Sequence, residues 1–187
     1  MRQILAVDIG GTFVDAVTFE PGSGELRFEK DFTTPEDPSV GVYAAIGRLG
    51  LDVATLGSFV HGTTLGLNTI LQRNGVRTGI ITNAGFEDVF EMARYMRERS
   101  QMYSLVYDTP PLLVPRRLRF GVRGRINAEG LELVPLDEGD VLAAARTLID
   151  QHGVGSIAVC TLHAYRNPAH EARIAEIIRQ RWPKVSV

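Results

Sequence analysis

The 187-residue sequence contains only one cysteine, Cys160, and no long apolar run. A single cysteine excludes an intrachain disulfide and is typical of proteins from a reducing compartment. No apolar stretch approaches the roughly 20 residues that cross a bilayer. The first residues also lack the apolar segment and the cleavage site of a signal peptide. We therefore expect a cytoplasmic protein without a membrane partner.

An excess of charge of one sign is also lacking, because 20 Lys and Arg residues nearly balance 22 Asp and Glu residues. The net charge of −2 gives the protein no general attraction to nucleic acid, so no nucleic-acid partner is expected. The hydrophobic content of 44% and the charged content of 22% are ordinary for a globular protein. The length suffices for one or two domains with a hydrophobic core.

Several common catalytic and nucleotide-binding motifs are absent from the sequence. It contains no Gly-x-x-x-x-Gly-Lys loop, no Gly-x-Gly-x-x-Gly turn, no Gly-x-Ser-x-Gly elbow and no His-Glu-x-x-His helix motif. A nucleotide would therefore have to bind through a different element, and the sequence offers the hairpin around residues 8–12.

This hairpin, within residues 4–15, is the most informative part of the sequence. An apolar run ends at Asp8, passes Gly10, Gly11 and Thr12, and resumes as an alternating strand. Glycines permit backbone conformations closed to other residues, and they leave no Cβ between the amides and a ligand. Successive N–H groups in such a turn form a nest for phosphate, and a carboxylate beside it can hold hydrated Mg²⁺. An ordinary Gly-Gly hairpin turn is the alternative.

The apolar periodicity predicts an antiparallel β-meander followed by alternating helices and strands. The predicted strands cover residues 3–9, 13–20, 26–33, 58–61, 77–82, 118–126 and 156–163. The predicted helices cover residues 38–49, 65–73, 86–92, 137–152 and 168–181, with Asn74-Gly75 closing the second helix and Asp137 capping the fourth. The pattern indicates an α/β fold in which helices flank a mixed sheet.

Residues 95–116 interrupt this pattern and predict an irregular excursion or a functional loop. Tyrosines and arginines are interleaved there, which makes the segment a candidate for contact with a ligand or a second subunit: Arg94, Tyr95, Arg97, Arg99, Tyr103 and Tyr107. Further arginines follow at positions 117, 119, 123 and 125. A solvated strand face explains these best, and bidentate binding of phosphate or carboxylate is the alternative.

A second candidate site follows the strand that ends near His61. Thr63 and Thr64 begin a helix there, and Asn68 lies one turn further on. The hydroxyls and the free N–H groups of a helix start could hold an anionic or carbonyl oxygen, and an imidazole titrates near neutral pH. The alternative is a threonine helix cap beside a structural histidine.

The remaining histidines and the cysteine favour structural roles. His163, His170 and Glu171 do not have the spacing of a compact zinc site, so a structural His163 is favoured. His152 follows a helix end, and Cys160 lies in an apolar run that predicts a buried, inert thiol. The last residues, 183–187, are typical of a strand that is beginning, which predicts that the sequence is a fragment of a longer chain.

The string Asp8-Ile9-Gly10-Gly11-Thr12-Phe13-Val14-Asp15 resembles the first phosphate loop of the actin, Hsp70 and sugar-kinase superfamily. Gly-Gly-Thr-Phe followed by Asp is similar to the hydantoinase A and 5-oxoprolinase group. Further stretches match that group in order and spacing: His61–Thr64 with Asn68, 77–82, 85–86, 113–116, 135–138, 157–160, 163–168 and 170–171. Val14, and Leu65-Gly66-Leu67, depart from the Thr and the Val-Ala-Thr of the family pattern.

The resemblance implies that residues 1–187 are the N-terminal domain of a longer ATP-dependent enzyme. It implies a ribonuclease-H-like (actin-like ATPase) core, with an insertion or loop excursion at residues 93–126 that adds an α/β portion. The implied reaction is phosphorylation of an amide or enol oxygen, which drives cyclic amide hydrolysis or ketone carboxylation. ATP and Mg²⁺ are the implied cofactors, and a cyclic amide or a ketone is the implied substrate. The implied partners are a second subunit or C-terminal domains, which would carry the second phosphate loop and the adenosine-binding segment.

The resemblance also implies roles for single residues, with Asp8, Asp15 and His61 as the catalytic set. Asp8 would organise Mg²⁺, Asp15 would lie near the metal or support the site, and His61 would face the substrate. The residues expected to contact the cofactor are Gly10, Gly11, Thr12, Thr63 and Thr64, the two threonines of the helix start standing beside the substrate or the transferred phosphoryl group. A sugar or acyl kinase of the same superfamily and a non-catalytic interaction domain are the alternative functions.

Overall fold

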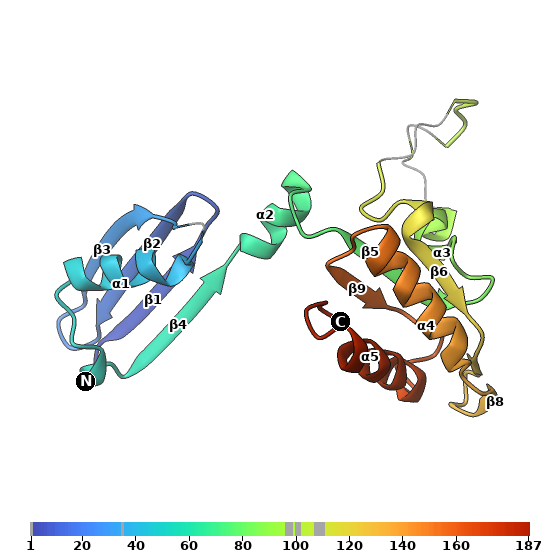
Figure 1. Cartoon of the computed structure of the whole chain (residues 1–187). Coiled ribbons are helices and arrows are strands. Elements are labelled where there is room, and N and C mark those ends of the chain that lie inside the picture. The colour runs from blue at the N-terminus through green and yellow to red at the C-terminus, as the bar shows by residue number, and fades with distance from the viewer. Residues whose placement is uncertain (1, 35, 96–98, 100–101, 107–110) are drawn as a thin grey trace. The chain divides into compact units, whose positions relative to one another are not determined.

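The computed structural model describes residues 2–34, 36–95, 99, 102–106 and 111–187 (Figure 1). The chain forms two compact units, Met1–Gly75 and Val76–Val187. Each unit buries a separate cluster of aliphatic side chains. The α/β fold with a mixed sheet and flanking helices is confirmed.

The first unit is a four-stranded sheet with the order β3-β2-β1-β4 (Figure 1). Its elements are β1 (Ile4–Ile9), β2 (Phe13–Glu20), β3 (Glu25–Phe32), α1 (Pro38–Arg48), the 3-10 turn η1 (Val53–Thr55), β4 (Ser58–Thr63) and α2 (Leu65–Gln72). β2 is antiparallel to both of its neighbours, whereas β4 is parallel to β1. The predicted meander is therefore confirmed, and β4 adds the parallel pair.

The period of two in the sequence decides which face of this sheet is buried. Leu5, Val7 and Ile9 alternate along β1 and are buried against α1 together with Val14 and other side chains of that cluster. α1 begins at a proline, which suits the first helical turn. The side chain of Asp37 accepts hydrogen bonds from the N–H and the hydroxyl of Ser39, and these bonds lower the pKa of Asp37.

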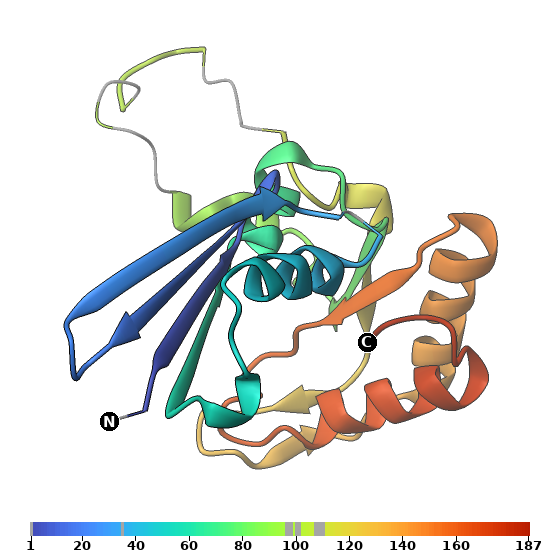
Figure 2. The same cartoon turned by 90° about the vertical axis from the view of Figure 1, so that its left-hand side faces the viewer.

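The second unit contains a three-stranded parallel sheet with the order β6-β5-β9 and a small β7-β8 hairpin. Its elements are β5 (Thr78–Asn83), α3 (Val89–Met92), η2 (Ala93–Tyr95), η4 (Arg116–Leu118), β6 (Arg119–Val122), β7 (Arg125–Ile126), β8 (Glu132–Val134), α4 (Glu138–Arg146), the π-helical turn η5 (Thr147–Gln151), β9 (Ser156–Val159) and α5 (Ala169–Arg181). Figure 2 shows the same elements from the side.

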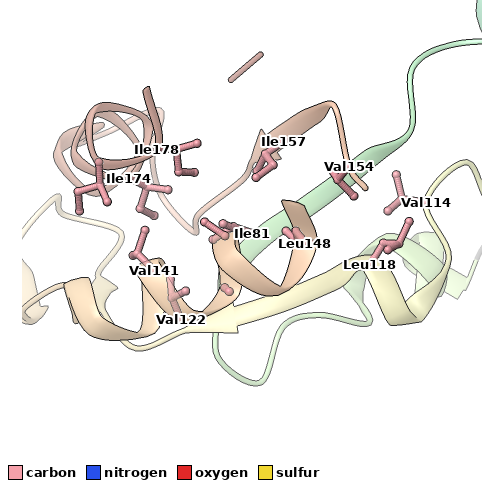
Figure 3. Packing of buried hydrophobic residues seen from close by; sticks show 13 residues of the cluster. Ile81, Val114, Leu118, Val122, Val141, Leu148, Val154, Ile157, Ile174 and Ile178 are labelled. Atoms are coloured by element: carbon pink, nitrogen blue, oxygen red, sulfur yellow. The ribbon is translucent and has the colours of Figure 1, made fainter. Parts of the chain in front are cut away.

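The core of the second unit is aliphatic and joins the sheet to α4, η5 and α5. Ile81 from β5 and Ile157 from β9 lie in one cluster with Leu148 from η5 and with Ile174 and Ile178 from α5 (Figure 3). Asp137 caps α4 by accepting the N–H of Asp140, as the sequence predicts.

Some predicted elements are shorter than expected, and each has a local cause. The strand predicted at 118–126 breaks at Gly124, where the φ angle is +152° and an added Cβ would lie 3.2 Å from His170. The strand predicted at 156–163 ends at Val159, and His163 turns the chain with a φ of 61°. The helix predicted from residue 86 begins only at Val89.

The second helix also closes differently from the prediction. Arg73 itself adopts the left-handed conformation, with a φ of 55°, in place of Asn74 or Gly75. At the end of the chain, Ser186 forms a parallel bridge with Ser156, so the strand-like pattern there is matched by backbone pairing.

Two interpretations of side-chain burial are wrong. Cys160 is exposed, because the strand ends just before it and the turn that follows does not cover it. Arg119 is fully buried and is not part of a solvated face. Its guanidinium donates to the Glu91 carboxylate at 2.8 Å and to the Glu87 carbonyl at 3.1 Å, and these partners compensate the buried charge.

The excursion predicted within 93–126 is only partly described. Arg97, Tyr107 and Asp108-Thr109-Pro110 lie outside the described residues. Arg94 has a φ of 58°, and Tyr103 is exposed. β6, at the end of this range, pairs with β5 in the parallel sheet. An insertion that covers all of residues 93–126 therefore stays a prediction. Within the described part of the chain, no helix has the length and apolarity that crossing a membrane needs.

Replacing Leu148 by alanine is expected to lower the free energy of unfolding of the second unit by about 3 kcal/mol, because a buried cavity would form. Leu148 has no exposed surface and packs against Gly79, whereas Leu131 is 63% exposed. The matched variant Leu131→Ala should therefore cost less than about 0.5 kcal/mol. Urea unfolding followed by the fluorescence of Trp182, the single tryptophan, would measure both. Equal losses in the two variants would contradict the assigned core.

The ion pair between Arg123 and Asp140 should make stability depend on acid pH. The Arg123 hydrogen bonds lower the pKa of Asp140 from about 3.8 to about 2. A carboxylate whose pKa is lowered by folding stabilises the folded state above about pH 4. This stabilisation is lost as the pH falls from about 4 to about 2. Asp140→Asn should thus destabilise the unit at pH 7 and become indistinguishable from the parent chain near pH 2. The prediction would be refuted if the urea midpoints of Asp140→Asn and the parent chain differed by the same amount at every pH. It would also be refuted if Asp150→Asn showed the same dependence of its urea midpoint on pH.

Candidate functional site

The turn between β1 and β2 is held by hydrogen bonds to the carbonyls of Gly10, Thr12 and Phe13, and two of its amides are open. The Gly10 N–H donates to the Phe13 carbonyl at 2.8 Å. Behind the turn, the Thr33 hydroxyl donates to the Gly10 carbonyl at 2.8 Å, and the Thr33 N–H donates to the Thr12 carbonyl at 2.9 Å. The N–H groups of Gly11 and Thr12 have no acceptor among the described residues. The turn therefore presents two backbone donors to solvent.

The two glycines are favoured by close neighbours rather than by unusual backbone angles. Neither Gly10 nor Gly11 has a positive φ, so the conformational freedom predicted from the sequence is not what the turn uses. A Cβ on Gly10 would lie 3.1 Å from the Phe13 carbonyl oxygen, and one on Gly11 would lie 2.8 Å from Nδ2 of Asn68. The turn thus has a close neighbour at each of its two glycines.

Asp8 lies in a polar row that crosses the sheet. The register pairs Asp8 with Asp15 on one side and with Gly62 on the other, and it pairs Asp15 with Lys30. Directly paired residues share a face of the sheet, and this face is opposite to the one that buries Val7. The Lys30 ammonium lies 2.7 Å from the Asp15 carboxylate, whereas Asp8 is exposed and has no ion pair within the described ranges. Asp8 is consequently the carboxylate open to a cation.

The start of α2 is fastened to the end of β1. The Thr64 N–H donates to the Ile9 carbonyl at 3.0 Å, and the Thr63 hydroxyl donates to the same oxygen at 3.2 Å. The Thr63 hydroxyl also accepts the Leu65 N–H at 3.2 Å. The sequence allowed either threonine to cap the helix, and in the structure Thr63 supplies the accepting side chain. Thr64 makes no such capping bond with its side chain. Both threonines therefore stand beside the Gly10–Thr12 turn.

His61 is not brought to this surface. Its register partner is Val7, so its side chain faces α1, on the side of the sheet opposite to Asp8. There it lines a pocket of about 700 Å³ together with Phe59 from β4 and Ile46 from α1. Within the first unit, the structure brings the start of α2 to the turn after β1, and it places His61 on the face of the sheet opposite to Asp8.

The histidines of the second unit make protein contacts. His170 is buried and its Nε2 lies 2.7 Å from the Glu132 carboxylate. Glu171 accepts the Thr161 N–H at 2.8 Å, and His163 lies 3.4 Å from the Tyr165 hydroxyl. Among the described residues, no group of three or more His, Cys, Asp or Glu side chains is arranged to hold a metal ion.

Asn68 is the site residue that reasoning from the sequence did not assign. It belongs to the motif that begins at His61, but only its contact with Gly11 shows where its side chain lies. The signal available in the sequence was its spacing of four residues from Thr64, which places both side chains on one face of a helix.

Comparison with known proteins gives one consistent result. The family model described as the hydantoinase/oxoprolinase N-terminal region matches residues 4–182. The acetophenone carboxylase gamma subunit of Aromatoleum aromaticum is 37% identical over 196 residues, which are 97% of this chain and 26% of the relative.

Two solved structures are similar over 98% of this chain and 28% of their own. The nucleotide-free structure of acetone carboxylase has a TM-score of 0.83 at 30% identity. The ATP-dependent caprolactamase of Pseudomonas jessenii has a TM-score of 0.77 at 30% identity. The chain thus spans between 26% and 28% of the length of these proteins. Because the family match covers nearly the whole chain, this chain belongs to the hydantoinase/oxoprolinase family, whose N-terminal region it matches.

Proposed function

We propose that this chain is the N-terminal part of an ATP-dependent enzyme that phosphorylates an amide or enol oxygen. Transfer of the γ-phosphoryl group to that oxygen would turn it into a leaving group for cyclic amide hydrolysis, or would give an enol phosphate for ketone carboxylation. The observation that carries the proposal is the single surface formed by Asp8, the Gly10–Thr12 turn and Thr64. Both solved relatives are described as ATP-dependent, which supports this reading.

The open amides of Gly11 and Thr12 and the hydroxyls of Thr12 and Thr64 would bind phosphate oxygens. Mg²⁺ is usually held by one or two carboxylates together with water and phosphate. Asp8 fits that role, because its carboxylate is exposed beside the turn and is not engaged by Lys30 as Asp15 is. When bound there, Mg²⁺ would neutralise phosphate charge. Asp15 would support the site through its pair with Lys30.

We further propose that the first unit is one half of a ribonuclease-H-like nucleotide-binding core. The strand order β3-β2-β1-β4, with β1 antiparallel to β2 and parallel to β4, supports this assignment. The second phosphate loop and the adenosine-binding segment would then belong to further domains or to a second subunit. A substrate contact by His61 stays a prediction, and it would take place at the pocket between α1 and β4.

Asp8→Asn in the full-length protein is expected to lower ATP turnover by about 100-fold or more, because a preorganised charge partner of the phosphates is lost. ADP release would be measured with Mg²⁺ and a panel of cyclic amides and ketones. Glu25→Gln removes the same charge from the exposed end of β3 and should leave turnover unchanged. Unchanged ATP affinity and turnover in Asp8→Asn would refute the proposed function and would favour a non-catalytic interaction domain.

The 187 residues alone are expected to hydrolyse MgATP at no measurable rate, because they would supply only one of the two phosphate loops. The measurement is phosphate release by the purified chain, with the full-length protein as the positive control. Robust Mg²⁺-dependent turnover by the chain alone would show that the whole nucleotide site lies within it.

A further inference from the structure

The side-chain amide of Asn68 rests directly on the Gly10–Thr12 turn. A Cβ added to Gly11 would lie 2.8 Å from Nδ2 and 3.5 Å from Cγ of Asn68. The amide therefore fills the space that any side chain at position 11 would need. Asn68 is half-buried, and α2, which carries it, buries none of its own side chains completely. The amide of Asn68 thus contacts the turn at Gly11.

The same amide also reaches Thr64, one helical turn earlier. Side chains of a helix tilt towards its N-terminus, so a residue at position i+4 covers the residue at position i. Nδ2 of Asn68 donates to Oγ1 of Thr64 at 3.4 Å, and the Asn68 N–H donates to the Thr64 carbonyl at 2.9 Å. Asn68 therefore connects the start of α2 with the turn.

This arrangement makes the Thr64 hydroxyl oxygen an acceptor for Asn68. A threonine hydroxyl has one donor and two acceptor positions. Because Asn68 donates to the oxygen, the Thr64 proton stays available to donate elsewhere, and the Thr64 hydroxyl has no acceptor among the described residues. A carboxylate in place of the amide would accept this proton, and an aliphatic side chain would leave the hydroxyl free to rotate.

We propose that Asn68 is a positioning residue of the phosphate surface. From its place against Gly11, it keeps the proton of the Thr64 hydroxyl available as a donor towards an anion. The inference rests on the proposed function of the turn and names a residue that acts through its neighbours. The ligand of the phosphate surface would be the phosphate chain of a nucleotide, and MgATP is the probe that tests it.

Three variants of the full-length protein test this role by calorimetric titration with MgATP. Asn68→Leu keeps the branched shape of the side chain and should weaken MgATP binding about tenfold, the size of one hydrogen bond to a charged group. Asn68→Asp reverses the direction of the hydrogen bond and adds negative charge, so it should weaken binding further. Asn74→Asp makes the same chemical change just beyond α2, at an exposed residue, and should bind MgATP like the parent protein.

A double variant separates positioning from a merely structural role. If Asn68 acts through the Thr64 hydroxyl, Asn68→Leu should have no further effect on MgATP affinity in a Thr64→Ala background. The thermal midpoint without nucleotide should stay unchanged in Asn68→Leu. Fully additive losses of affinity, or parent-like affinity in Asn68→Leu, would overturn the inference.

The Asp8→Asn variant tells the two possible failures apart. If Asp8→Asn loses MgATP-dependent turnover while Asn68→Leu binds MgATP like the parent, only the role of Asn68 is refuted. If neither variant changes MgATP binding or turnover, the proposed function of the turn fails as well.

Discussion

The candidate site depends on the parallel pairing of β4 with β1. This pairing brings the Ile9 carbonyl within reach of the Thr63 hydroxyl and the Thr64 N–H, although these residues are more than 50 positions apart. Parallel strands need a crossover connection, and here α1 supplies it and covers one face of the sheet. Without this pairing, the turn after β1 and the start of α2 would be two unrelated loops. With it, they form one surface of backbone amides and hydroxyls.

The two faces of the first sheet carry different chemistry because side chains alternate along each strand. The face towards α1 is apolar and includes the pocket lined by His61. The opposite face carries Asp8, Asp15 and Lys30 in register. A family motif that reads continuously in the sequence is therefore divided in space. His61 and Thr63 share the face towards α1 because they are two residues apart on β4, whereas Thr64 and the start of α2 lie beside the turn after β1.

The second unit contains ion pairs between residues far apart in the sequence. The arginines that alternate along residues 117–125 suggest a charged outer face, yet Arg119 is enclosed and paired with Glu91. Arg123 bonds Asp140 at the start of α4 and thereby ties the end of β6 to that helix. Such partners lie 17 to 28 positions away, so local periodicity could not reveal them.

The sequence alone determined the features that depend on neighbouring residues. These are the alternation of strands and helices, the capping of α4 by Asp137, and the Gly-Gly-Thr turn that opens the family resemblance. Only the tertiary structure decided what is buried and what meets across strands. It placed Asn68 on Gly11 and left Cys160 exposed. The physical reason is that caps and turns are closed by bonds within a few residues, whereas burial and register are fixed by contacts between segments far apart in the chain.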